Sequence, residues 1–169
     1  MRVLGIDPGT LNLGYGVVDE DEDGDGGGMT MVACGVLSLS AKIPVERRLS
    51  SLYKSLGEIV TRYRPDEVAI EEPFVAGNAR SALAIGRAQA IAILAAANKN
   101  LPIFRYLPTQ VKQQVTDYGN SSKEQVQEMV RLQLGLAQQP QPSDAADALA
   151  VAICHFHQRH IERLLARGK

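Results

Sequence analysis

The chain has little of what marks secreted, membrane-spanning or metal-cluster proteins. It contains only two cysteines, Cys34 and Cys154, which stand far apart among apolar residues. This placement predicts small buried side chains rather than a disulfide or a metal cluster. No apolar run reaches the roughly 18 residues of a membrane span, and residues 1–7 lack the layout of a signal peptide. We therefore expect a cytoplasmic protein with no membrane contact.

The sequence also lacks the basic excess that usually marks a nucleic-acid-binding protein. Its net charge is -1, but six of its 19 acidic residues lie between Asp19 and Asp25. Leaving out those six negative charges changes the net charge of the remainder to +5. The overall charge therefore conceals a mildly basic remainder and does not exclude a polyanionic partner.

The length of 169 residues and the hydrophobic content of 45% fit a single compact domain, residues 1–169. The spacing of apolar residues, prolines and glycines predicts alternating strands and helices. In chain order, we expect strands at 2–7, 13–18 and 29–37, a helix at 44–63, a strand at 68–70, a helix at 79–98, a strand at 102–107, and helices at 109–115, 122–136 and 144–165. The alanine-rich helix at 79–98 should be buried nearly all round, within the chain or against a partner subunit. The pattern indicates a mixed α/β fold.

Four acidic residues stand where they could share a ligand. Asp7 and Glu71 each end a predicted apolar strand, and Asp144 and Asp147 occupy positions i and i+3 of one helix face. Each has an ordinary explanation, because Asp7 precedes a Pro-Gly turn and first-turn acids favour the helix dipole. Together, however, strand ends and a helical acid pair can meet at one ligand site. Ligands that are all oxygen indicate magnesium or manganese rather than zinc.

Two such ions about 4 Å apart can stabilise both the attacking and the leaving oxygen in the hydrolysis of a phosphodiester. The residues alone therefore support a site for hard cations. They also suggest phosphodiester hydrolysis as its chemistry.

Four sequence runs closely resemble those of bacterial RuvC Holliday-junction resolvases, in the same order and over nearly the whole chain. They are 5–10 (GIDPGT), 70–74 (IEEPF), 110–113 (QVKQ) and 143–150 (SDAADALA). The resemblance implies a ribonuclease H-like fold, with a five-stranded mixed sheet whose first three strands are antiparallel, flanked by helices. It also implies a structure-specific DNA endonuclease of homologous recombination and DNA repair. Such an enzyme resolves Holliday junctions by paired symmetric nicks, leaving 5'-phosphate and 3'-hydroxyl ends.

Matched residue by residue, the resemblance implies that Asp7, Glu71, Asp144 and Asp147 are catalytic ligands of two Mg²⁺ ions per subunit, which Mn²⁺ can replace. Glu72 is rejected as a ligand, because the motif aligns Glu71 and a strand alternates its faces.

The resemblance further implies DNA contacts outside the carboxylates. Lys112 and Lys123 match lysines near the scissile phosphate, where an ammonium can offset developing charge. Phe74 matches an aromatic residue that stacks on an unpaired base at the junction centre. Arg80 and Arg87 are expected to contact phosphates.

The partners that the resemblance implies are a four-way DNA junction, a second copy of the chain, and a branch-migration complex of the RuvA and RuvB type. The alanine-rich helix around Gly86 is the candidate dimer contact. A preference for thymine-containing cleavage sequences is implied as well.

Two other patterns imitate metal sites. The acidic segment, residues 19–25, resembles the start of a calcium-binding EF-hand loop. Thr30, however, stands where the bidentate glutamate of such a loop belongs, so we expect a hairpin loop. Cys154, His157 and His160 lack a fourth zinc ligand, and we expect the two histidines at a helix surface.

Three alternative functions remain open at this point. One is a nucleotide-binding protein of the sugar-kinase and actin type, although that class needs two ribonuclease H-like lobes and this chain has length for one. Another is a ribonuclease H-like nuclease that processes RNA. The third is a junction-binding module without activity, which the four acids disfavour.

Overall fold

The computed structural model describes residues 1–9, 11–20, 28–72 and 79–167, without the side chains of Ala79 and Arg80. Its centre is a five-stranded sheet in the order β3-β2-β1-β4-β5. The strands are β1 (Arg2–Asp7), β2 (Asn12–Glu20), β3 (Met29–Ser38), β4 (Glu67–Glu71) and β5 (Ile103–Tyr106).

β1, β2 and β3 pair antiparallel, whereas β4 pairs parallel to β1 and β5 parallel to β4. The mixed sheet with three antiparallel first strands confirms the expected fold.

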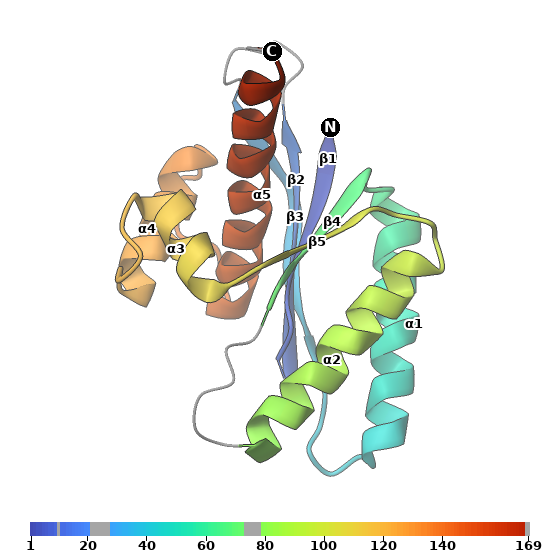
Figure 1. Cartoon of the computed structure of the whole chain (residues 1–169). Coiled ribbons are helices and arrows are strands. Elements are labelled where there is room, and N and C mark those ends of the chain that lie inside the picture. Colours follow the sequence, from blue (N-terminus) through green and yellow to red (C-terminus); the bar gives the residue numbers. More distant parts are fainter. Residues whose placement is uncertain (10, 21–27, 73–78, 168–169) are drawn as a thin grey trace.

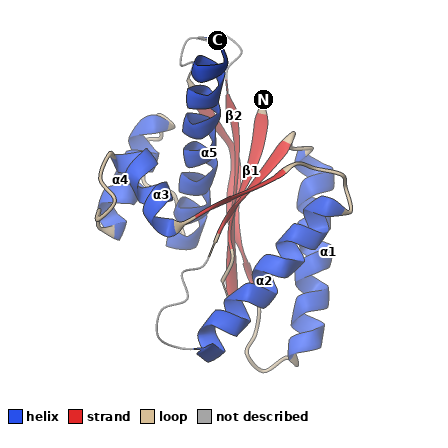
Figure 2. Ribbon diagram, viewed as in Figure 1, coloured by secondary structure: helices blue, strands red, loops and turns tan. Residues whose placement is uncertain are grey.

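Helices cover both faces of this sheet (Figures 1 and 2). α1 (Val45–Tyr63) and α2 (Ala79–Ala97) lie against one face, and α5 (Ser143–Arg167) crosses the other. α3 (Pro108–Thr116) and α4 (Lys123–Gln133) pack against α5. Every expected helix and strand is present, with ends that differ by only a few residues from those predicted.

Strand alternation divides the core into two apolar clusters. Leu4 and Ile6 of β1 belong to the cluster on the α1 and α2 side, together with Leu52 and Leu56 of α1. Val3 of the same strand belongs to the cluster built around α5. Consecutive residues of β1 thus point to opposite faces, so the sheet is buried on both sides.

α5 lies very close to the sheet because glycines, which have no side chain, occupy strand positions that face this helix. A Cβ atom on Gly5 would lie 2.1 Å from the carbonyl oxygen of Ala148, and one on Gly14 would lie 2.0 Å from that of Asp144. Alanines occupy much of the buried face of α5. This close approach fixes the first turns of α5 beside the end of β1.

A buried polar network holds the middle of α5 to β4 and β5. The ring of His155 is fully buried; its Nδ1 lies 2.7 Å from the hydroxyl of Tyr106, and its Nε2 contacts the carboxylate of Glu67. Arg159 donates to the same carboxylate over 3.0 Å. Burial lowers the pKa of His155 despite the neighbouring carboxylate. The network therefore links the element that carries Asp144 and Asp147 to the strand that carries Glu71.

The expectation that α2 is buried nearly all round is wrong within a single copy of the chain. Leu83 and Leu94 expose 57% and 48% of their surface, so the helix is not buried all round. Its two sides differ, because Ala88 and Ala92 pack into the core while the leucines face outward.

The remaining expectations concern cysteines, histidines and the acidic segment. Cys154 is buried as expected, whereas Cys34 is only half-buried, and both are free thiols. His157 and His160 are partly buried, and His157 Nδ1 lies 2.8 Å from a backbone carbonyl. The strands that flank the acidic segment pair as arms of a hairpin, and residues 21–27 lie outside the described residues.

Within the described chain, no helix has the length and apolarity needed to cross a membrane.

Candidate active site

The four predicted acids come together at one end of the sheet. Asp7 is the last residue of β1 and Glu71 the last of β4, and these strands are parallel neighbours whose ends coincide. Asp144 and Asp147 lie in the first turns of α5, which begins at the same end. One oxygen each of Asp7, Asp144 and Asp147 lies within 4.8 Å of the other two. Glu71 faces the same cavity but is not part of that closest group.

Strand alternation explains why Glu71, and not Glu72, faces this cavity. Glu67, Ala69 and Glu71 point toward the α5 side of the sheet, whereas Val68 and Ile70 point toward α1 and α2. Glu72 lies outside this group, with its carboxylate 3.6 Å from Arg105.

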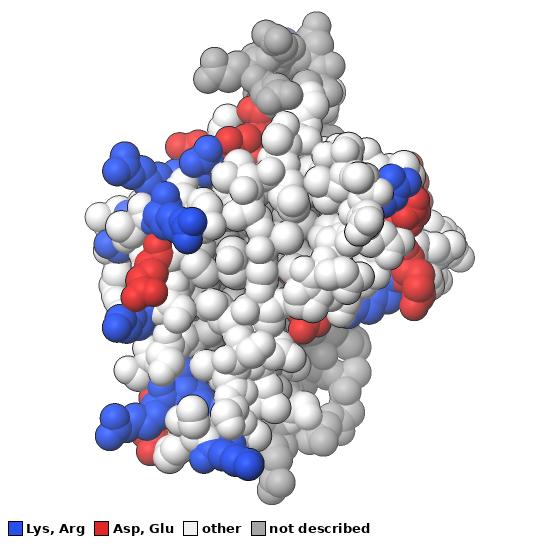
Figure 3. Space-filling model, turned by 180° about the vertical axis from the view of Figure 1, so that it is seen from behind, with Lys and Arg blue, Asp and Glu red and all other residues white. Residues whose placement is uncertain are grey.

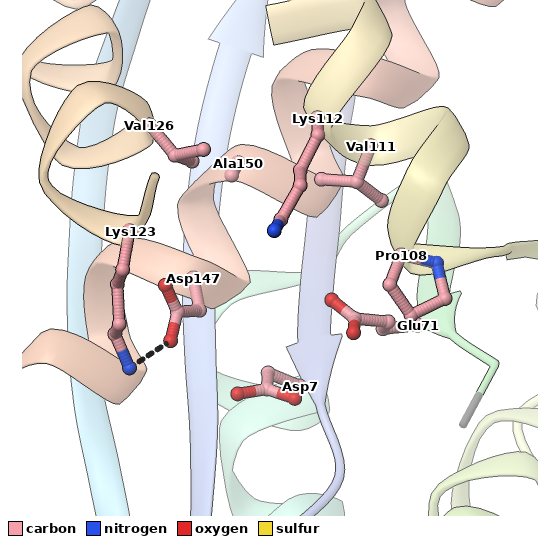
Figure 4. A pocket seen from close by; sticks show the side chains of 9 residues that line it. All are labelled: Asp7, Glu71, Pro108, Val111, Lys112, Lys123, Val126, Asp147 and Ala150. Carbon is pink, nitrogen blue, oxygen red and sulfur yellow. Dashed lines mark ion pairs between the residues drawn. The ribbon is translucent and has the colours of Figure 1, made fainter. Parts of the chain in front are cut away.

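A cavity of about 200 Å³ lies between these carboxylates and the helices α3 and α4. Figure 4 shows Asp7, Glu71 and Asp147 on one side, with Lys112 reaching in from α3 and Lys123 from α4. The rest of the lining is Pro108, Val111, Val126 and Ala150. No motif in the sequence pointed to a role in the site for these four residues.

The electrostatics of the cavity favour a positive ligand. Burial, followed by repulsion from Asp147 and Asp144, raises the pKa of Asp7 to about 6. Burial and the nearby charges of Asp7 and Asp147 raise the pKa of Glu71 to about 8. Desolvated carboxylates that lie close together resist ionisation, and a cation among them would relieve this resistance.

The two lysines offset part of this negative charge. Lys123 Nζ lies 2.7 Å from a carboxylate oxygen of Asp147 and 4.0 Å from one of Asp144. This hydrogen bond to Asp147 raises the pKa of Lys123, which keeps the ammonium charged. Lys112 lines the cavity on the side of Glu71 and makes no ion pair among the described residues.

Of the three other predicted DNA contacts, the structure describes only the side chain of Arg87. Arg87 is exposed on α2 and lines a separate hollow beside Gly9, not the acidic cavity. Arg80 lies in the first turn of α2, with its side chain outside the described part. Phe74 also lies outside the described residues.

The fold and the site together define a class of protein. A sheet in the order 3-2-1-4-5, with carboxylates from its two central strands and its last helix meeting at one cavity, is the arrangement of ribonuclease H-like nucleases. Ligands that are all oxygen suit hard divalent cations.

Comparison with known proteins identifies the family. The family model described as "Crossover junction endodeoxyribonuclease RuvC" matches residues 3–155. A RuvC crossover junction endodeoxyribonuclease of Dehalococcoides mccartyi is 53% identical over 99% of this chain and 98% of its own length. That of Chloroflexus aggregans is 50% identical over 93% of each chain. The chain belongs to the RuvC family of crossover junction endodeoxyribonucleases.

Solved structures agree with this assignment. Thermus thermophilus RuvC superimposes with a TM-score of 0.88 at 36% identity, covering 96% of this chain and 97% of that one. The same protein in complex with a Holliday junction substrate gives 0.89 at 35% identity, covering 96% of each chain. Neither the sugar-kinase and actin class nor an RNA-processing nuclease is favoured by these comparisons.

Proposed function

We propose that this protein is a Mg²⁺-dependent endonuclease that resolves four-way DNA junctions by paired symmetric nicks, in homologous recombination and DNA repair. The observation that carries the proposal is the convergence of Asp7, Asp144 and Asp147 with Glu71 and two lysines in one cavity. The likeness to Thermus thermophilus RuvC, whose structure with a Holliday junction is known, supports the choice of substrate. The products are ends with 5'-phosphate and 3'-hydroxyl groups.

The donor set fits Mg²⁺. Three carboxylates from two elements offer oxygens within 4.8 Å of one another, and Glu71 adds a fourth from the neighbouring strand. Mg²⁺ prefers such oxygen ligands and retains water, and Mn²⁺ shares the preference. Two bound ions would polarise the scissile phosphate and activate water. We assign Asp7, Glu71, Asp144 and Asp147 as the ligands.

The lysines act on the phosphate rather than on the metal. Lys112 reaches into the cavity beside Glu71, where an ammonium can offset the charge that develops on the phosphate oxygens. Lys123 holds Asp147 in place and can contact the DNA backbone as well. The apolar side chains of Val111 and Val126 limit water on the helix side of the cavity.

We also propose that the protein acts as a twofold-symmetric homodimer, with residues 1–169 forming a single nuclease domain. Two equivalent sites are what paired nicks on opposed strands require. The exposed Leu83 and Leu94 of α2 supply an apolar surface for the second copy. Phe74, Arg80 and Arg87 are proposed DNA contacts, and a branch-migration complex of the RuvA and RuvB type is the proposed further partner.

A synthetic four-way junction tests the proposal. The wild-type protein should cut two opposed strands at symmetric positions with Mg²⁺ or Mn²⁺, leave linear duplex largely intact, and cut nothing in chelator. Asp7→Asn should bind the junction without cutting it. Equal cutting of linear duplex would contradict the junction specificity, and unchanged cleavage by Asp7→Asn would contradict the metal site.

A further inference from the structure

We propose that Arg48 of α1 and Arg87 of α2 form a phosphate-binding subsite that holds the DNA backbone next to the cut. This inference rests on the proposed junction-cleaving function and extends it, because it adds Arg48 and pairs it with Arg87. The two side chains line the same hollow with Gly9, on the face of the sheet opposite α5.

The hollow and the acidic cavity are lined by residues that are near neighbours in the sequence. Gly9 is two residues beyond Asp7, so their Cα atoms are at most about 7 Å apart. β1 ends where α1 and α2 begin, as Figure 1 shows at its lower end. A DNA strand whose scissile phosphate lies at Asp7 could therefore reach the hollow within a few nucleotides.

The two arginines form no ion pair with any acidic residue that the structure describes. Among the described residues, neither Arg48 nor Arg87 takes part in an ion pair, whereas Arg2, Arg131, Arg159 and Arg163 all do. Arginine keeps its charge at every pH at which proteins fold, so two guanidinium groups at one hollow repel unless an anion lies between them.

Arg48 also carries an unsatisfied donor. Its Nε atom is buried and has no hydrogen-bond partner among the described residues, as is also true of the Nε of Arg159. A buried polar atom without a partner costs free energy, so it calls for an explanation. An anion in the hollow would pair with the Arg48 guanidinium, and arginine is the side chain best suited to bind phosphate with two parallel hydrogen bonds.

The size and surroundings of the hollow select a phosphate group. Its volume is about 60 Å³, so the hollow is small and can admit phosphate oxygens. Leu49, Leu52 and Ala88 form much of the remaining wall and offer no base-specific donors. Figure 3, seen from behind, shows Lys and Arg side chains gathered at the lower left, over the end where α1 begins. The subsite therefore positions the backbone without reading sequence.

Binding of a four-way junction with Ca²⁺ in place of Mg²⁺, over a range of salt concentrations, measures the contact. Arg48→Ala should weaken binding roughly tenfold at low salt and reduce the salt slope by about 1, as expected for one lost phosphate contact. Arg48→Lys should keep part of the slope and recover part of the affinity. Arg47→Ala is the matched control, because Arg47 is an exposed neighbour on the same helix that does not line the hollow. Thermal unfolding should show all three variants folded.

A scan with neutral methylphosphonates, one at each of three phosphates on either side of the cut, locates the contact. One position should weaken the wild type and Arg47→Ala by the same factor, yet leave Arg48→Ala and Arg87→Ala unaffected. If all four proteins are equally sensitive at every position and the wild type still cuts the junction with Mg²⁺, the subsite is refuted and the proposed function stands. A wild type that neither binds nor cuts the junction would overturn the proposed function, and the subsite with it.

Discussion

Neutralising one carboxylate of the acidic cavity should make the metal-free protein more stable at pH 8. Glu71 has a pKa of about 8 in the folded chain, against an ordinary value of 4.5. Between those values the folded state binds more protons than the unfolded state, so the free energy of unfolding falls as the pH rises from about 4.5 to 8. Asp7 adds to this fall between about pH 4 and pH 6.

The size of the effect follows from the shift in pKa. One unit corresponds to about 1.4 kcal/mol, so at pH 8 the charged Glu71 carboxylate costs about 4 kcal/mol. A glutamine removes that charge but leaves a polar amide whose burial costs about 1–3 kcal/mol. We expect Glu71→Gln to gain about 2 kcal/mol at pH 8, which raises Tm by about 4–8 °C in a chain of this size. At pH 5, where the folded-state carboxyl is protonated, the gain should vanish.

Thermal unfolding in chelator at pH 5 and pH 8 measures this difference. Glu72→Gln is the matched control, because Glu72 lies outside the cavity and should leave Tm nearly unchanged at both pH values. Added Mg²⁺ should stabilise the wild type more than Glu71→Gln, since binding to the folded state alone raises stability. A Glu71→Gln variant that is destabilised equally at both pH values in chelator would refute this reasoning.

Three further predictions concern α5 and α2, and the first has a matched control in α1. Gly14→Ala should lower stability by about 2–4 kcal/mol and reduce junction cleavage, because its Cβ would meet the α5 backbone at 2.0 Å. Gly57→Ala, which meets nothing within 4 Å, should be neutral or stabilising in the same unfolding and cleavage assays. His155→Leu should cost about 3 kcal/mol in urea unfolding, because it leaves the buried Glu67 carboxylate without its imidazole partner. Leu94→Glu should shift the protein from dimer to monomer in analytical ultracentrifugation; an unchanged dimer would place the second copy elsewhere.

The sequence was sufficient to predict the strands of the sheet and the side of the fold to which the acidic side chains point. Alternation along β4 places Glu71 on the same face as Glu67, and an i, i+3 spacing places Asp144 beside Asp147. Both are local rules of backbone geometry. The choice between Glu71 and Glu72 also required the resemblance to the RuvC motif, because alternation alone does not say which of two adjacent acids faces the site.

Features that depend on contacts between distant elements could not be predicted from the sequence. His155 joins Glu67, 88 positions earlier, and Tyr106, 49 positions earlier. The exposure of Leu83 on an alanine-rich helix depends on which of its sides packs on the sheet. The burial of Arg48 Nε without a partner among the described residues likewise depends on how the chain packs around it.

The central claim is that Asp7, Asp144 and Asp147, with Glu71, hold the metal ions that support cleavage. Crystals of the wild-type protein soaked in Mn²⁺ test it most directly, by anomalous difference density. A peak is expected among these carboxylates, at about the 2.1 Å that hard divalent ions take from oxygen, and this peak should be lost in Asp7→Asn. An active protein whose crystals bind Mn²⁺ only elsewhere would contradict it.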